Sequence, residues 1–186
     1  MDRGLPAARA ALEAQLGQLS GEPKLALSAL LADIGQLGQI RHVIDGGTMS
    51  PTGAFQAYTN IVDAEFQYFY ASIQDKSAAL ADVSIGAVDG DYALEMTSRE
   101  ATLVAGALAT GGQLSPSVHE LFTASVASRR LMLDEATSVL TPSLRSAYLA
   151  VGVSREYQQF QALENQIQAS AGNGPIPVTA LPLPDS

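Results

Sequence analysis

One helix-joining motif occurs twice in the sequence, and it constrains the fold more than any other feature. The letters GGTMSP occupy residues 46–51, and GGQLSP occupies residues 111–116. A glycine pair supplies the left-handed residue that ends a helix, and Ser-Pro supplies an N-cap followed by proline at the first helical position. Each motif therefore predicts a turn between two helices. In an up-and-down chain we expect both turns at the same end of the bundle.

Further capping signals divide the rest of the chain. Thr141 and Pro142 repeat the cap-and-proline pattern, Asp89 or Asp91 supplies another cap, and the letters GEPK break the first segment. Frequent Ala and Leu favour helix, and no convincing strand alternation is present. The sequence predicts six helices, at residues 4–20, 23–45, 51–86, 91–110, 116–139 and 142–169.

Apolar stripes with helical spacing predict how these helices pack. The longest stripe starts at Phe55 and continues through Lys76, Leu80 and Val83 in alternating steps of four and three residues, which is the spacing of a face that contacts other helices. The middle of this stripe is expected in the core, namely Phe66, Phe69 and Ile73. The predicted fold is all-α, an elongated antiparallel up-and-down bundle. We expect this bundle at residues 1–171 and a Pro-rich tail or linker at 172–186.

Composition and charge narrow the classes of function. Hydrophobic residues make up 47% of the chain and charged residues 16%, which is the composition of a folded protein. The net charge of −9 disfavours nucleic acid and anionic membranes as partners, so a bound anion would need local positive groups. The absence of cysteine excludes disulfides and thiolate chemistry. Because neither a membrane span nor a signal peptide is evident, the sequence predicts a cytosolic protein or a segment of a larger one.

Two arginines interrupt predicted core stripes. Arg41 lies on the stripe of the second helix, and Arg129 lies on that of the fifth helix with Arg130 beside it. A guanidinium in a core stripe is costly unless an anionic group meets it. It can extend to the surface or pair with an acidic side chain, or it can bind a planar oxyanion with its forked donors. The acidic residues considered for such pairs are Asp45, Glu65 and Glu95.

Arg99 lies on the fourth predicted helix, away from the main apolar stripe of that helix. Met96 and Leu103 share its side of the helix, so this helix has a second apolar face and is expected to be covered on two sides. Arg99 would then lie between packed layers, and a solvated surface arginine is the alternative. The main stripe consists of Leu94, Thr97, Ala101, Val104 and Leu108.

Enzyme chemistry finds little support in the sequence. His42 and His119 are the only histidines, and neither falls in a Glu-x-x-His or His-Glu-x-x-His frame. A Gly-rich phosphate loop and a nucleophile elbow are both absent. We therefore expect no catalytic activity, no metal site and no cofactor.

Two segments carry a resemblance to a known family. Residues 41–47 read Arg-x-x-Ile-Asp-x-Gly and are followed by Tyr58-Thr59, and the letters SRE at 98–100 lead into a helix of small residues. Over roughly residues 25–150 the chain resembles the nitrate- and nitrite-sensing type domain found in actinobacterial sensor histidine kinases. The family domain usually continues with further helix where this chain becomes Pro-rich.

The resemblance implies an all-helical sensor domain with an anion site associated with arginines. Arg41 matches the arginine of the first motif and Arg99 that of the second, and His42 takes the place of a basic residue that often follows the first arginine. With Arg129 and Arg130 from the stripe analysis, these five residues form the predicted ligand-binding set.

The resulting hypothesis is an extracytoplasmic sensing domain of a membrane-bound sensor histidine kinase or kinase-like protein. It would bind a small anion such as nitrate or nitrite, form a homodimer in the full-length receptor, and contact the membrane only through flanking segments. A cytoplasmic kinase domain would lie outside this sequence. One alternative is a ligand-free helical module for dimerisation or protein interaction, and the other is an enzyme or metal-binding bundle.

Overall fold

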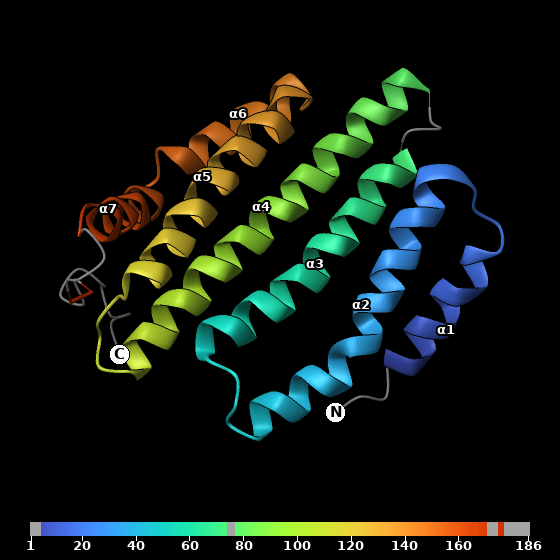
Figure 1. Cartoon of the computed structure of the whole chain (residues 1–186). Helices are drawn as coiled ribbons and strands as arrows, with labels where there is room; N and C mark the ends of the chain where they lie inside the picture. The colour runs from blue at the N-terminus through green and yellow to red at the C-terminus, as the bar shows by residue number, and fades with distance from the viewer. Residues whose placement is uncertain (1–4, 74–76, 171–174, 177–186) are drawn as a thin grey trace. The chain divides into compact units, whose positions relative to one another are not determined.

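The computed structural model describes residues 5–73, 77–170 and 175–176. The described residues contain seven helices and, apart from one isolated bridge between Gln113 and Pro175, no β-structure (Figure 1). The all-α prediction is therefore confirmed. The helices are α1 (Leu5–Leu16), α2 (Gly21–Asp45), α3 (Pro51–Ile73), α4 (Ala78–Ala109), α5 (Pro116–Ser138), α6 (Pro142–Gly152) and α7 (Arg155–Ala169).

The chain divides into two compact units, residues 1–84 and 85–186. In the first unit, α1 packs against α2, and α2 forms an antiparallel hairpin with α3 (Figure 1). Leu27 and Leu30 of α2 are buried, and they form a core with Leu31 and Ala64. Burial of these apolar side chains holds the hairpin together.

The first repeated motif forms the turn between α2 and α3 as predicted. Gly46 donates its amide to the carbonyl of His42 at 3.0 Å, and Gly47 adopts the left-handed conformation with φ of 66°. The Ser50 hydroxyl then accepts the amide of Gly53 at 3.0 Å, which caps α3. Glycine ends one helix, and Ser-Pro starts the next.

The second motif forms the equivalent turn between α4 and α5. Gly111 and Gly112 have φ of 102° and 75°, and the Ser115 hydroxyl caps α5 by accepting the amide of Val118 at 3.3 Å. The amide of Ile176 donates to the carbonyl of Gly112 at 2.8 Å, so the chain returns to this turn after α7. Because the two turns belong to different units, their expected placement at one end stays a prediction.

In the second unit, α4 and α5 form an antiparallel hairpin (Figure 1). Gly86 of α4 faces Val139 at the end of α5, and a Cβ atom at Gly86 would collide with the Val139 side chain. Glycine at this position therefore permits the close approach of the two helices. The buried residues of α4 from there onward recur in steps of three and four and are Gly86, Asp89, Ala93, Met96, Glu100, Leu103 and Ala107.

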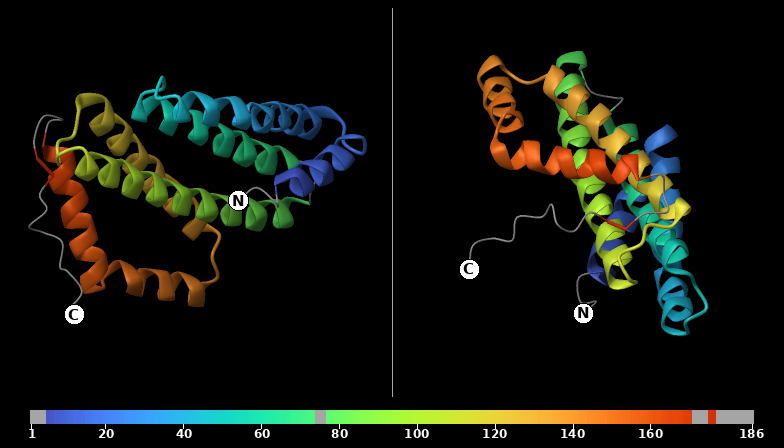
Figure 2. Two further views of the ribbon diagram at one scale, coloured as in Figure 1. Left: turned by 90° about the horizontal axis from the view of Figure 1, so that it is seen from below. Right: turned by 90° about the vertical axis from the view of Figure 1, so that its left-hand side faces the viewer.

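Helix α7 crosses the α4–α5 hairpin near the second turn, and α6 connects it to the far end of α5 (Figure 2). Ser154 caps its first turn by accepting the amide of Tyr157 at 3.2 Å. At its other end, His119 of α5 donates from Nε2 to the carbonyls of Ile167 and Gln168 at 3.1 and 3.0 Å. The side chain of Ile167 is buried at the same end of α7.

Three predictions of helix boundaries were wrong. The helix predicted at 51–86 ends at Ile73, and α4 passes through the Val-Asp-Gly-Asp segment at 88–91 where a break was predicted. An interior glycine such as Gly90 costs about 1 kcal/mol relative to alanine, which the packing of α4 offsets. The helix predicted at 142–169 is divided before Arg155, where Ser154 caps α7.

The long predicted stripe was also wrong, at Phe69 in its middle and in the part that follows Ile73. Phe66 and Ile73 are buried as expected, but Phe69 is 39% exposed and contacts the Phe66 ring edge-on. Leu80 and Val83 are more than half exposed, and Lys76 lies outside the described residues. The predicted stripe required one continuous helix. In the structure α3 ends at Ile73, and Leu80 and Val83 belong to α4.

Candidate functional site

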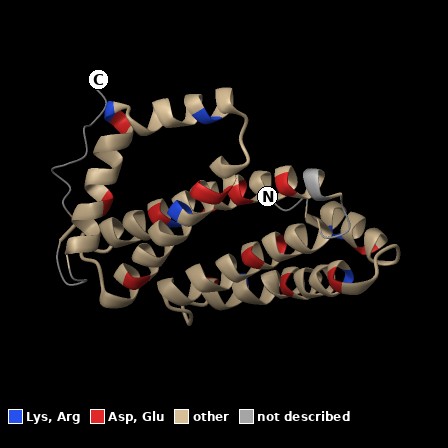
Figure 3. Cartoon of the chain, turned by 90° about the horizontal axis from the view of Figure 1, so that it is seen from above, with Lys and Arg blue, Asp and Glu red and all other residues tan. Residues whose placement is uncertain are grey.

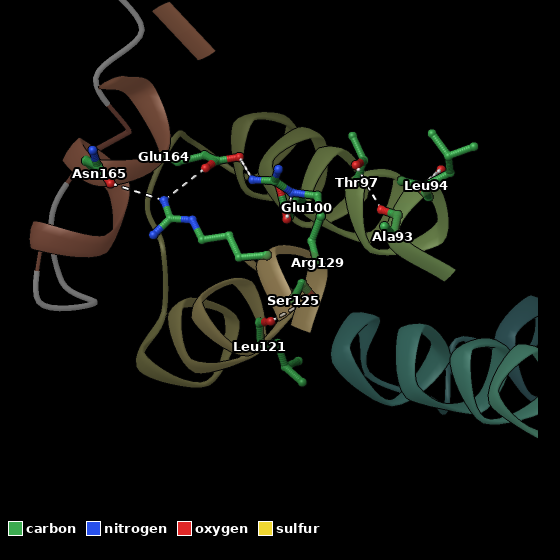
Figure 4. Close-up of polar contacts among 11 residues, drawn as sticks. Ala93, Leu94, Thr97, Glu100, Leu121, Ser125, Arg129, Glu164 and Asn165 are labelled. Carbon is green, nitrogen blue, oxygen red and sulfur yellow. Dashed lines mark hydrogen bonds and ion pairs between the residues drawn. The ribbon is translucent and has the colours of Figure 1, made fainter. Parts of the chain in front are cut away.

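Helices α4, α5 and α7 each place one charged residue in the interior of the second unit. Arg129 of α5 donates from Nε to Oε1 of Glu100 on α4 at 2.9 Å, and from Nη2 to Oε1 of Glu164 on α7 (Figure 4). All three side chains are 3% exposed. We call Glu100, Arg129 and Glu164 the buried ion cluster.

The groups around Arg129 stabilise its buried positive charge, which would otherwise be costly. Its guanidinium carbon lies 5.1 Å from the ring centroid of Phe160, a cation–π arrangement. Arg130 approaches the same cluster from outside, with Nη2 3.3 Å from both Glu164 Oε2 and Asn165 Oδ1. The Arg130 side chain remains 45% exposed. Removing one member of such a cluster leaves an uncompensated buried charge.

Glu100 is the least satisfied member of the cluster. Its Oε2 atom is buried and has no hydrogen-bond partner. Burial raises the pKa of Glu100 from 4.5 to about 7, against the opposing hydrogen bond and charge of Arg129, and the nearby Glu164 raises this pKa further. Despite desolvation, the pKa of Arg129 is raised by the hydrogen bond and charge of Glu100 and by the charge of Glu164. Glu100 can therefore gain or lose a proton near neutral pH while Arg129 stays charged.

A pocket of about 300 Å³ lies beside the cluster, between α4, α5 and α7. Glu100 and Glu164 contribute to its wall, and Thr97 is the third polar residue that lines it. The rest of the lining is apolar. It comes from Ala101, Val104, Ala105 and Leu108 of α4, Phe122 of α5, and Phe160, Leu163 and Ile167 of α7.

The pocket explains the two apolar faces of α4. The predicted main stripe lines the pocket through Val104 and Leu108, although Leu94 at its start is 67% exposed. The face expected to be secondary carries Met96 and Leu103, which are buried. The helix is thus apolar on both faces, and the more deeply buried face is the one judged secondary from the sequence.

The five predicted ligand-binding residues lie in different settings. Arg41 is half-buried on α2 in the first unit, and His42 beside it is exposed. Arg99 donates from Nε to Glu95 Oε1 at 2.9 Å, and its guanidinium lies 5.8 Å from the ring centroid of Tyr92. The structure brings Arg129 and Arg130 together at Glu164 (Figure 4).

Sequence reasoning found Arg129 but missed both of its partners. Glu100 lies on a stripe of buried α4 residues, and Glu164 lies on the α7 stripe formed with Phe160 and Ile167 at steps of four and three. Each was a charged residue on an apolar stripe, which is the same signal that identified Arg129. Matching the arginine in one stripe with acids in the other stripes would have predicted the cluster.

The described part of the chain has few basic positions, and these lie among more numerous acidic ones (Figure 3). Within residues 5–73, 77–170 and 175–176, no group of three or more His, Asp or Glu side chains is placed to hold a metal ion. None of the helices described there is both long and apolar enough to cross a membrane. The buried ion cluster and its pocket are therefore the best-defined polar site in these residues.

Comparison with known proteins gives the family. A family model described as nitrate and nitrite sensing matches residues 1–183, which is nearly the whole chain. The chain therefore belongs to the nitrate- and nitrite-sensing family, whose members are sensing domains. No characterised protein and no solved structure matches the chain significantly.

Proposed function

We propose that this chain is the extracytoplasmic sensing domain of a membrane-bound sensor histidine kinase or kinase-like protein, and that arginine side chains bind nitrate or nitrite. The family match over residues 1–183 carries the proposal. Flanking segments would attach the domain to the membrane, and a homodimer would pass the signal on as a small shift of helices. The kinase chemistry would belong to another domain of the same receptor.

The surroundings of the arginines rank them as anion ligands. Arg129 already donates to two carboxylates, and Arg99 donates to one. A free anion would have to compete with these carboxylates at Arg129 and Arg99. Arg41 comes first in our proposal because it carries the family motif and is half-buried on a core stripe of α2. Arg130 comes second, because 45% of its side chain is exposed.

Isothermal titration with nitrate and nitrite at constant ionic strength tests this proposal. We expect saturable binding that weakens in Arg41→Lys, which keeps the charge but loses the forked donors, and weakens more in Arg41→Ala. Arg9→Ala is the matched control, because Arg9 is an exposed arginine of the same unit that pairs with Glu13. Saturable binding that is equal in the Arg41 and Arg9 variants would place the anion elsewhere.

A second candidate function is a ligand-free module for dimerisation or protein interaction. Helix α6 favours this alternative, because it has no buried residue and exposes apolar side chains. Leu149 and Val151 of α6 are 60% and 57% exposed. Sedimentation analysis of the wild-type protein and of a Leu149→Gln variant tests it. A dimer that dissociates in the variant, together with no anion binding to either protein, would favour the interaction module.

A further inference from the structure

The pocket beside the buried ion cluster is chemically unlike a nitrate site. Its volume of about 300 Å³ is at the lower end of the range for small-molecule sites, and most of its lining is apolar. A small inorganic anion would lose its hydration there without gaining donors, and it would meet the carboxylates of Glu100 and Glu164. An apolar body fits the walls formed by Val104, Leu108 and Leu163. The pocket is therefore suited to a different class of ligand.

The polar residues that line the pocket offer no free donor and no positive charge, because Thr97 Oγ1 already donates to the carbonyl of Ala93 at 3.1 Å and the lining contains no basic residue. Glu100 uses Oε1 to accept from Arg129, whereas its Oε2 is buried without a partner. Two carboxylates share one buried guanidinium, and Arg130, the other cation at the cluster, stays 45% exposed and donates to Glu164 and Asn165. An unpaired buried acceptor is costly. A ligand that supplies a hydrogen-bond donor to Glu100 Oε2 therefore gains the most binding free energy.

We propose that this pocket binds a small, mainly apolar molecule that carries a single ammonium group. The apolar body lies against the pocket walls, and the ammonium group donates to Oε2 of Glu100. This contact satisfies the unpaired acceptor and balances the second carboxylate of the cluster. The site is separate from the anion site proposed at Arg41, which belongs to the first unit.

Binding of an ammonium ligand is coupled to the proton on Glu100. Glu100 is faced by Arg129 from α5 and by Glu164 from α7, and Tyr157 of α7 is a hydrogen-bond partner of Arg129. Because burial raises the pKa of Glu100 to about 7, part of the protein holds this proton at neutral pH. The ammonium group favours the ionised carboxylate, so binding releases a proton and strengthens as the pH rises from 6 to 8.

Three probes of equal chain length separate the contribution of the head group from that of the apolar body. These are hexylammonium, 1-hexanol and hexanoate, titrated calorimetrically into the whole chain at pH 7.5. We expect saturable binding of hexylammonium, at least tenfold weaker binding of hexanol, and no binding of hexanoate. Repeating the hexylammonium titration in two buffers of different ionisation enthalpy measures the proton release. Equal binding of all three probes, or no binding of hexylammonium to the folded protein, would overturn the proposal.

Two variants and one matched control locate the site. Glu100→Gln keeps the side-chain shape but removes the charge, so hexylammonium should bind at least tenfold more weakly and without proton release. Glu95→Gln is the control, because it is the same change five residues earlier on α4, outside the pocket lining. Ala105→Leu narrows the pocket and should weaken both hexylammonium and hexanol. Circular dichroism confirms folding of each variant, and hexylammonium binding unchanged in both Glu100→Gln and Ala105→Leu would refute the assignment. Nitrate titrations run in parallel report on the Arg41 site independently.

Discussion

Replacing Glu100 with glutamine should change how the stability of the second unit depends on pH. The pKa of Glu100 is about 7 in the folded protein and 4.5 in its ordinary state, so the folded protein holds this proton more tightly than the unfolded chain. The stabilisation from that proton is present at low pH and is lost as the pH rises through 7. Wild-type protein should therefore lose stability relative to Glu100→Gln between pH 5 and pH 8.

The expected size of this change in stability follows from the difference between the folded and unfolded pKa values of Glu100. A tenfold change in proton affinity corresponds to about 1.36 kcal/mol, so a pKa that rises from 4.5 to about 7 amounts to roughly 2–3 kcal/mol over this pH window. Comparison with the variant removes the contributions of the other acidic residues, which both proteins share. Glutamine can still accept from Arg129 Nε through its amide oxygen, so the fold should be retained.

The assay is urea unfolding followed by far-ultraviolet circular dichroism at several pH values between 5 and 8. Hydrogen exchange of peptides from α5 and α7 assigns the transition to the second unit. Glu95→Gln is again the control, since Glu95 pairs with Arg99 outside the cluster, and its pH profile should follow that of the wild type. Profiles for wild type and Glu100→Gln that run parallel from pH 5 to pH 8 would refute the reasoning.

Four further substitutions test the packing of the second unit. Arg129→Met leaves buried carboxylates uncompensated and should lower the free energy of unfolding by roughly 3–5 kcal/mol, whereas Arg130→Ala should cost about 1 kcal/mol or less in the same urea assay. Gly86→Ala forces a collision with Val139 and should cost roughly 1–3 kcal/mol; a double variant with Val139→Ala should recover most of that loss. His119→Ala removes the donor to the last carbonyls of α7 and should cost about 1 kcal/mol, with faster hydrogen exchange confined to the C-terminal half of α7.

The helix joints could be predicted from the sequence because capping is local chemistry. Gly47, Gly111 and Gly112 adopt positive φ, and Ser50 and Ser115 accept amides at the starts of α3 and α5, as their positions indicated. The same reasoning failed at residues 88–91, where α4 is continuous. There the packing of the α4 stripe outweighs the helix-breaking tendency of Asp-Gly, and packing depends on residues far along the chain.

The candidate site could be predicted only in part, for a related reason. Arg129 was recognised because a charge on an apolar stripe is unusual in its own helix. Glu100 was missed because the competing stripe with Val104 and Leu108 is more apolar, although it lines a pocket. Glu164 was missed because its contact with Arg129 joins residues 35 positions apart. Local spacing identifies the unusual residue, whereas its partner depends on the tertiary fold.

The most direct test of the proposed anion sensing is a nuclear magnetic resonance titration that observes the arginine side-chain Nε–H groups. Nitrate replaces chloride at constant ionic strength, so general screening stays the same throughout. We predict that the Nε–H signal of Arg41 moves saturably with nitrate and that the signal of Arg9 stays in place. If no arginine signal responds to nitrate beyond its response to chloride in the folded domain, arginine-mediated nitrate binding is contradicted.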